Sequence, residues 1–364
     1  EAMEIADKYG DDRRTEIMNV SGEVDIEDLI PEETCVFTLT DFGYIKRIPM
    51  SEYQTQRRGG KGIKGLTRRE DDIVKTMFTA STHDHIAFFT SKGRTFRLKG
   101  YEIPEGSRTS KGMNIVNLLP LESGETISSM NCGRGDDYKY LCMFTRNGII
   151  KRSAVSEYSN IRRTGVIAIT LDEGDELAWV KMTKGNDDII VATKKGMSIR
   201  FNENDARPIG RTARGVKAIE LGEGDEVIGV ATVEEGKSIL TVSETGFGRI
   251  SDFDNYRVQS RGGKGLINYH TEKNGDVAAV TSVSDDNDII LIASDGIIIR
   301  IPADGISKFA RPSKGVRVMR VTEGEKIVTL TPVEKEEEEE TAAEESAETA
   351  ESAESTETSE QTEE

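Results

Sequence analysis

The sequence predicts an all-β protein of six repeated units arranged around an axis, as in a β-propeller. Three observations support this prediction. Pairs of strand-like runs meet at a glycine turn six times, at intervals of about fifty residues. A second glycine, preceded by Lys or Arg, follows each pair at a similar spacing. No amphipathic helical pattern separates the units, so the strands are expected to form small sheets repeated radially.

Each unit opens with two strand-like runs around a glycine. The first runs are residues 35–40, 85–91, 140–146, 188–194, 238–244 and 289–295. The turn glycines are Gly43, Gly93, Gly148, Gly196, Gly246 and Gly296. The second runs are residues 44–48, 94–98, 149–152, 197–201, 247–250 and 297–301. Two β-rich runs joined by a short glycine turn predict a hairpin, so the pattern predicts six hairpins.

A basic loop follows the hairpin in each unit. The loops end at Gly62, Gly112, Gly165, Gly215, Gly265 and Gly315. In a radial repeat, loops that occupy the same position in every unit lie at the same height and radius around the axis. The six basic loops are therefore expected to form a ring. Acidic glycine turns at 122–125, 172–175, 222–225 and 323–325 have another phase and are expected elsewhere on the surface. The loop cations after the first unit are Arg108, Lys111, Arg162, Arg163, Arg211, Arg214, Arg261, Lys264, Arg311 and Lys314. A second row is predicted from the strand arginines Arg47, Arg97, Arg152, Arg200, Arg249 and Arg300.

The first basic loop is the longest and most regular, and we call it the box: Gln56, Arg57, Arg58, Gly59, Gly60, Lys61 and Gly62. Its glycines can adopt positive φ and leave room for a close approach, so successive N–H groups can point at a phosphate. The three cations supply charge to the same phosphates. A near copy lies at Gln259–Gly265, with Ser260 in place of the first arginine. Because no base-reading helix accompanies these loops, we predict sequence-independent contact with a polyanion backbone.

The net charge of −18 is concentrated near the ends of the chain. Residues 334–364 contain 15 Glu and one Lys, and residues 1–20 contain six acidic and three basic residues. The remaining residues carry a net charge of only −1, so the body can still present a basic face. The acidic segment has no aliphatic residue larger than alanine, which predicts a disordered tail.

These patterns divide the chain into three parts: residues 1–21, the end of a helix and a linker; residues 22–333, the repeated body; and residues 334–364, the tail. The first residue is Glu1, and no helix cap precedes it, so we expect the sequence to begin partway through a longer protein. No apolar run reaches the roughly 18 residues of a membrane span.

Other motifs favour structural roles. Gly236-Lys237-Ser238 resembles the end of a phosphate-binding P-loop, but Ala231 replaces the required glycine and a strand follows. His83-Asp84-His85 lacks further metal ligands and is expected to be a turn. The cysteines show no disulfide or zinc spacing, which favours a reducing compartment. The tyrosines and Trp179 are expected to pack between units, and no residue pair indicates catalysis.

The six units, the box and the acidic tail together resemble the C-terminal domain of bacterial DNA gyrase A. The box matches the signature of that family at all seven positions, and the resemblance covers residues 22–333. Residues 8–16 also resemble the junction that follows the family's coiled coil. The resemblance implies a six-bladed β-pinwheel whose blades exchange strands.

The resemblance also implies that double-stranded DNA wraps around the basic rim and that the box secures the wrap. The implied setting is an A2B2 heterotetramer with gyrase B and the N-terminal part of gyrase A, in the cytoplasm and associated with the nucleoid. ATP and Mg act in other parts of that enzyme, as does the catalytic tyrosine. The chain itself is therefore expected to bind and bend DNA without cutting it, and to need no cofactor or metal of its own.

Two alternatives remain open. The corresponding domain of the A-type component of topoisomerase IV usually has a degenerate box or none, so the intact box favours gyrase. A propeller that docks acidic protein partners on its basic loops is the other. Wrapping of DNA predicts a steep dependence on salt and a preference for long duplex, which a protein partner does not.

Overall fold

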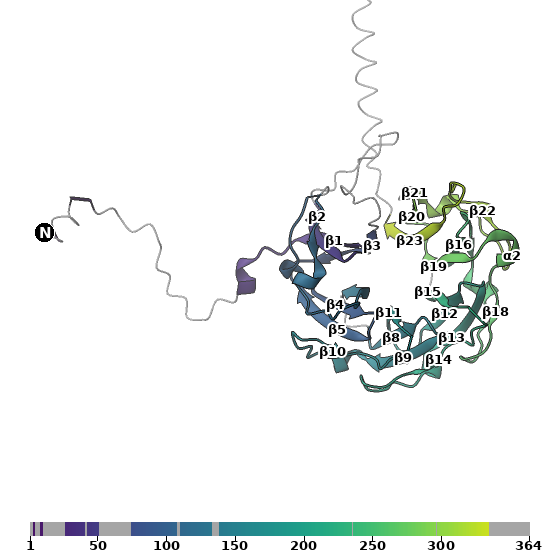
Figure 1. Cartoon of the computed structure of the whole chain (residues 1–364), viewed down its shortest axis with the longest axis horizontal. Helices are drawn as coiled ribbons and strands as arrows, with labels where there is room; N and C mark the ends of the chain where they lie inside the picture. The colour runs from purple at the N-terminus through teal and green to yellow at the C-terminus, as the bar shows by residue number, and fades with distance from the viewer. Residues whose placement is uncertain are drawn as a thin grey trace, which may run out of the picture.

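The computed structural model of the protein contains six small antiparallel sheets, arranged as blades around a central opening (Figure 1). It describes residues 26–40, 42–50, 74–107, 110–132, 138–234, 236–295 and 297–334, together with Met3, Lys8 and Tyr9. The predicted all-β, six-bladed architecture is confirmed. The box, the rest of residues 1–21 and residues 335–364 of the predicted tail lie outside the described residues, whereas Glu334 is the last residue of a strand.

Each blade has an inner strand, a central hairpin and, in five blades, a two-residue outer strand. Blade 1 contains β3 (Val74–Ser81), β1 (Thr34–Thr40), β2 (Tyr44–Pro49) and β6 (Met113–Asn114). Blade 2 contains β7 (Ile127–Cys132), β4 (His85–Thr90), β5 (Arg94–Lys99) and β10 (Val166–Ile167). Blade 3 contains β11 (Leu177–Thr183), β8 (Tyr140–Thr145), β9 (Ile149–Ala154) and β14 (Val216–Lys217).

The second half of the ring repeats this plan. Blade 4 contains β15 (Val227–Thr232), β12 (Asp188–Thr193), β13 (Met197–Asn202) and β18 (Leu266–Ile267). Blade 5 contains β19 (Val277–Val283), β16 (Ser238–Ser243), β17 (Phe247–Ser251) and β22 (Val316–Arg317). Blade 6 contains β23 (Ile327–Glu334), β20 (Asn287–Ala293) and β21 (Ile298–Pro302) among the described residues. The inner strand β23 of blade 6 lies beside β3 of blade 1, which brings the two ends of the ring together.

Short helical segments connect these strands. They are η1 (Ile26–Leu29), η3 (Gly100–Glu102), η4 (Ile115–Asn117), η5 (Val155–Tyr158), η6 (Glu203–Asp205), η7 (Phe253–Asn255), η8 (Ala303–Gly305) and α2 (Thr271–Asn274). Four of the 3-10 turns, η3, η5, η6 and η8, directly follow the second strand of a hairpin, and η7 follows after one residue. They turn the chain out of its own blade.

The outer strand of each of the first five blades comes from the following repeat. After the hairpin of blade 2, for example, the chain places β6 on the edge of blade 1, where Asn114 pairs with Tyr44. It then returns to its own blade as the inner strand β7, which pairs with β4. Repeats 2 to 6 therefore each link two neighbouring blades, and the strand exchange implied by the resemblance is present in the described residues.

The turn glycines serve this exchange as well as the hairpins. Gly93 has φ +74, and an added Cβ would lie only 2.5 Å from the carbonyl oxygen of Ile169, which comes from the next repeat. At Gly196 the corresponding distance to the Tyr269 oxygen is 2.2 Å. A glycine at these points thus allows positive φ and close approach of a foreign backbone. This explains why glycine recurs at the same phase of the sequence.

The core lies between blades. Phe37 of blade 1 belongs to the same buried cluster as Phe88 and Phe96 of blade 2. Central strands are consequently buried on both faces; β16 has no exposed residue along its length. Tyr158 and Tyr256 are buried in clusters that join neighbouring blades, as expected, whereas Tyr44 and Tyr101 are only half-buried.

Candidate nucleic-acid interface

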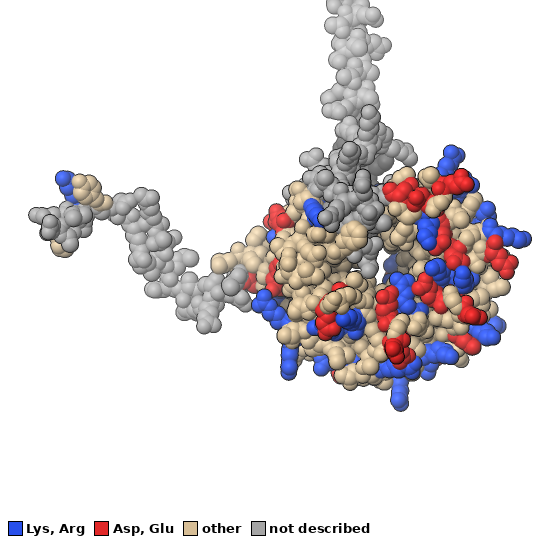
Figure 2. Space-filling view, viewed as in Figure 1, with Lys and Arg blue, Asp and Glu red and all other residues tan. Residues whose placement is uncertain are grey.

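The five basic loops that end at Gly112, Gly165, Gly215, Gly265 and Gly315 lie at the outer edge of the disc because each one directly precedes an outer strand. Gly165, for example, ends a loop and is followed at once by β10 on the edge of blade 2. In the face seen in Figure 2, Lys and Arg side chains project from the edge at several places, with acidic side chains both on the face and at the edge. The repeat thus places cations around the edge, as predicted for the loops that are described. The box and Arg108 lie outside the described residues.

Several loop cations are held by neighbouring groups. The Lys111 ammonium lies 3.7 Å from the ring centroid of Tyr44, and Lys314 lies equally close to Phe247. These cation–π contacts fix the lysine heads over the first residue of β2 and β17. Arg261 donates from Nη1 to the Lys217 oxygen at 3.0 Å. Such arginines stabilise the loops and have fewer donors left for a ligand.

Other loop cations remain available. Within the described part of the chain, the side chains of Arg162, Arg163, Arg211 and Lys264 form no hydrogen bond or ion pair with protein. Arg214 instead pairs with Asp172, which belongs to an acidic turn. The hydrogen bond from Arg214 is the main cause that lowers the pKa of the exposed Asp172 carboxyl. The predicted separation of basic loops from acidic turns is therefore incomplete at this point.

The predicted second row of strand arginines needs correction. Arg152 of β9 is only 2% exposed and pairs with Glu203 at 2.8 Å, so it is not available to DNA. The remaining ion pairs of this series are Arg47 with Glu105 at 3.3 Å, Arg200 with Asp188 at 2.9 Å and Arg300 with Asp288 at 2.7 Å. Arg249 is fully buried and donates to the Asn268 oxygen. Five of these arginines share a repeat phase, and most of them contact the following repeat, as Arg47 does through Glu105 and Arg97 through the Ser159 oxygen. Arg249 lies one position earlier, and Ile250 occupies the shared phase in β17.

Buried cations beneath the loops were not predicted from the sequence. Lys46, Lys151 and Arg249 occupy one position in β2, β9 and β17, opposite Thr38, Met143 and Thr241. The same position holds Phe96, Ile199 and Ile299 in the other three blades. Lys46 Nζ donates to the Ser107 and Ser110 oxygens at 2.9 Å, and Lys151 Nζ donates to the Arg211 oxygen at 2.6 Å. In the sequence, this position alternates between a cation and an apolar residue from one repeat to the next, and this alternation could have indicated that the cations are buried. Lys46 and Lys151 hold the backbone of a basic loop from inside.

The pH dependence of stability should report the buried Lys151. Burial lowers the pKa of its ammonium from 10.5 to about 8. Between these values the unfolded chain binds the proton and the folded chain does not, so the free energy of unfolding rises with pH from 8 to 10.5. The contribution is on the order of 3 kcal/mol. Urea unfolding measured across this window should show the rise in the unmodified chain.

The matched variant is Lys151→Met. It removes the titrating group, so the unfolding free energy of the unmodified chain should rise relative to that of the variant as the pH increases. Parallel pH profiles for the two proteins would contradict a lowered pKa at Lys151.

The remaining candidate sites are structural. His83 Nε2 lies 2.8 Å from the Ile30 oxygen, and no group of three or more His, Cys, Asp or Glu residues in the described ranges could hold a metal. Burial raises the pKa of the Cys142 thiol to about 12, as expected of a buried structural cysteine. Among the helices that the structure describes, none has the length and apolar character needed to span a bilayer.

Comparison with known proteins agrees with this geometry. The family model described as the DNA gyrase C-terminal domain, a β-propeller, matches residues 36–81, 84–132, 139–184, 187–234, 237–284 and 287–334. Each match covers one repeat. A solved structure of a DNA gyrase A C-terminal domain superposes with a TM-score of 0.69 at 28% identity, covering 82% of this chain and 99% of the other.

Relatives along the whole sequence are similar to this chain. The DNA gyrase A protein of Halalkalibacterium halodurans is 51% identical over 341 residues, and that of Clostridium acetobutylicum is 47% identical over 341 residues. In both comparisons the match covers 93% of this chain but 41% of the relative. The chain thus spans less than half the length of these relatives. Its six matched repeats show that it belongs to the family of DNA gyrase C-terminal β-propeller domains.

Proposed function

We propose that this chain binds duplex DNA along the outer edge of the disc and bends it around the blades without reading base sequence. The observation that carries the proposal is the set of unpaired cations on successive edge loops, Arg162, Arg163, Arg211 and Lys264. Cations repeated at one radius match a phosphate backbone that follows the edge. The box, at the same phase of the first repeat, extends this track.

The gyrase setting follows from the family. We propose that the chain serves as the wrapping domain of gyrase A in an A2B2 enzyme with gyrase B, acting on the chromosome in the cytoplasm. The chain would hold a DNA segment in a wrap of fixed handedness, and the enzyme would pass that segment to introduce negative supercoils. DNA cleavage, ATP and Mg belong to the other parts of that enzyme, so this chain supplies binding and curvature.

The linking number of plasmid DNA tests this function. Relaxed plasmid is closed by ligase in the presence of the chain, the protein is removed, and the topoisomers are separated. A shift of the distribution in one direction, growing with the protein-to-DNA ratio, is expected for chiral wrapping. An unshifted distribution would overturn the proposal and would favour the docking of an acidic protein partner instead.

A second candidate is the corresponding domain of topoisomerase IV. A solved C-terminal domain of DNA topoisomerase IV superposes with a TM-score of 0.70, but at 22% identity this shows a shared fold alone. The complete box at Gln56–Gly62 favours gyrase. Supercoiling by an enzyme reconstituted from gyrase B and a gyrase A chain that carries this domain would distinguish the two, because only the gyrase function predicts net negative supercoiling of relaxed plasmid.

Deleting residues 335–364 is expected to tighten binding of duplex DNA several-fold at low salt. Residues 335–364 contain 14 Glu and one Lys, so this segment would compete with phosphates for the edge cations. The gain should vanish at about 1 M salt, where the screening length is about 3 Å. Titrations at several salt concentrations measure it. The control is a full-length chain in which these Glu are changed to Gln, and it should bind as tightly as the deletion variant. Equal affinity of the unmodified chain, the deletion variant and the Gln variant at low salt would contradict the competition.

A further inference from the structure

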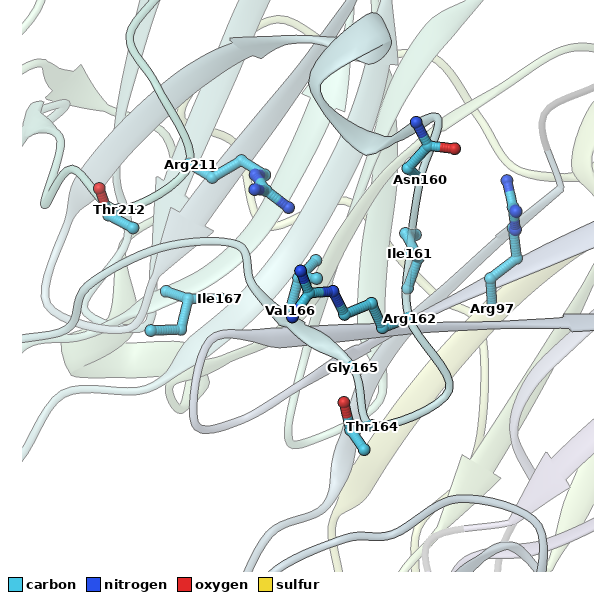
Figure 3. A pocket seen from close by; sticks show the side chains of 10 residues that line it. All are labelled: Arg97, Asn160, Ile161, Arg162, Thr164, Gly165, Val166, Ile167, Arg211 and Thr212. Atoms are coloured by element: carbon cyan, nitrogen blue, oxygen red, sulfur yellow. The ribbon is translucent and has the colours of Figure 1, made fainter.

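An open pocket of about 620 Å³ lies at the outer edge where blades 2 and 3 meet (Figure 3). We call it the edge pocket; Arg97, Arg162 and Arg211 line it, each from a different repeat. In Figure 3 the guanidinium groups of Arg162 and Arg211 point toward one another. No Asp or Glu is among the residues that line this pocket. Facing cations without a counter-charge repel, and an anion placed between them relieves the repulsion.

Each of these arginines differs from its counterparts in other repeats. Four strand arginines have carboxylate partners, whereas Arg97 forms no ion pair within the described ranges and donates only to the Ser159 oxygen at 2.9 Å. In the loops of repeats 5 and 6, Arg261 and Arg311 donate to backbone carbonyls at 3.0 and 2.7 Å. Arg162 and Arg211 have no such partner in the part of the chain that is described. Three guanidinium groups without a carboxylate partner in the described residues therefore gather at this junction.

The backbone around the edge pocket is well held although its arginine heads are free. Lys151 Nζ donates to the Arg211 oxygen at 2.6 Å from below. Thr170 Oγ1 donates to the Thr212 oxygen at 2.7 Å, and Arg94 Nη2 donates to the Thr164 oxygen at 2.9 Å. Both loops are thus positioned before any ligand arrives. Because these loops need no further ordering, less conformational entropy is lost when their two arginines bind an oxyanion than when cations on mobile loops bind it.

The other walls suit a sugar–phosphate backbone. Ile167, which is 51% exposed, and Ile161 provide apolar surface beside the arginines, and Thr164 and Thr212 add hydroxyl groups. Guanidinium groups match phosphate oxygens in a bidentate geometry, whereas apolar side chains can contact deoxyribose carbons. A volume of about 620 Å³ exceeds that of a single phosphate ion and accommodates a stretch of backbone.

We propose that the edge pocket is a discrete binding site for the phosphodiester backbone of the bound duplex, which it grips more tightly than the rest of the edge. The proposal rests on the proposed function and adds to it a defined anchor point between blades 2 and 3. The wrap would then have a preferred register on the disc, set by this anchor as well as by the box.

The test compares two variants of the full chain that lose the same charge. The pocket variant, Arg162→Gln/Arg211→Gln, removes two cations from the edge pocket. The control variant, Lys264→Gln/Lys314→Gln, removes two cations from edge loops of repeats 5 and 6. Affinity for a long duplex is measured by fluorescence anisotropy over a range of salt concentrations. Both variants should lower the salt slope by roughly two. At about 0.1 M salt the pocket variant should bind about tenfold more weakly than the control variant.

A charge-preserving variant, Arg162→Lys/Arg211→Lys, separates geometry from charge. Its affinity should fall between those of the unmodified chain and the Gln variant, because an ammonium cannot make the bidentate contact. Inorganic phosphate, compared with chloride at equal ionic strength, should weaken duplex binding by the unmodified chain but not by the Gln variant. Thermal unfolding of each protein checks that the blades remain folded.

The outcomes separate the anchor from the general function. If the unmodified chain shifts the linking number but the two Gln variants bind duplex equally, or the Lys variant keeps full affinity, the edge pocket is not a discrete site and wrapping stands. If the unmodified chain neither binds long duplex nor shifts the linking number, the proposed function itself fails.

Discussion

Arg152→Met is expected to destabilise the protein by about 3–5 kcal/mol, because it leaves the Glu203 carboxylate buried without its cation. The pair joins two blades: Arg152 is in β9 of blade 3, and Glu203 begins η6, which follows β13 of blade 4. Their side chains are 2% and 0% exposed, with nitrogen and oxygen 2.8 Å apart. Such a loss is a large part of the roughly 5–15 kcal/mol that stabilises a typical domain.

The surrounding hydrogen bonds explain why Glu203 cannot adapt easily. Its Oε1 accepts from the backbone N–H groups of Gly185 and Asp187 at 2.8 Å, and its Oε2 accepts from Thr183 Oγ1 at 2.7 Å. These bonds hold the carboxylate in its buried position, so removal of Arg152 leaves it there without its cation. The measurement is urea unfolding at pH 7.

Trp179 provides the probe, because it is the one tryptophan of the chain and lies in β11 of the same blade, packed against the core cluster that contains Phe144. The control is Arg152→Met/Glu203→Gln, which removes both charges and keeps an amide oxygen for the backbone donors. This double variant should be more stable than Arg152→Met alone. If the double variant is equally destabilised, the loss comes from packing around Arg152 and not from the unpaired carboxylate.

Replacement of the box, Gln56–Gly62, with seven alanines is expected to abolish the shift in linking number while duplex binding remains measurable. The box contains three cations and three glycines, and the other basic loops keep their charge. Loss of the glycines also removes the freedom to adopt positive φ, on which the expected contact between backbone N–H groups and a phosphate depends. An enzyme reconstituted from gyrase B and a gyrase A chain that carries this variant domain should then relax DNA without supercoiling it.

The near copy at Gln259–Gly265 offers the comparison for the box. There only the cations are replaced, as Arg261→Ala/Lys264→Ala, because an added Cβ at Gly265 would lie 2.2 Å from the Ser198 oxygen and disturb blade 4. This variant should weaken binding but keep a linking-number shift. Complete loss of duplex binding by the box variant, or an unchanged shift, would show that the box does not secure the wrap.

The repeats and their hairpins could be predicted closely from the sequence. The predicted run 85–91 corresponds to β4 at His85–Thr90, and 197–201 corresponds to β13 at Met197–Asn202. The signals were local: a glycine at a tight turn and apolar residues on both sides of it. The prediction for the loops also holds at the level of placement, since those in the described ranges lie on the outer edge.

Strand exchange could not be derived in this way. Outer strands such as Val166–Ile167 have two residues, too few for any periodicity, and their partners lie far away in the sequence. Only the packing of neighbouring blades decides that β10 joins β5 and not a strand of its own repeat.

The arginines show the same division most clearly. The sequence by itself determined six repeats, the phase of each cation within its repeat, and the acidic composition that follows the body. The tertiary structure alone decided that Arg152 is buried against Glu203 while Arg162 and Arg211 face one another across an open pocket. The physical reason is that the position of a residue in its repeat sets its height and radius on the disc. The partner of its side chain, in contrast, often comes from a neighbouring repeat. Availability to a ligand therefore depends on contacts distant in the chain.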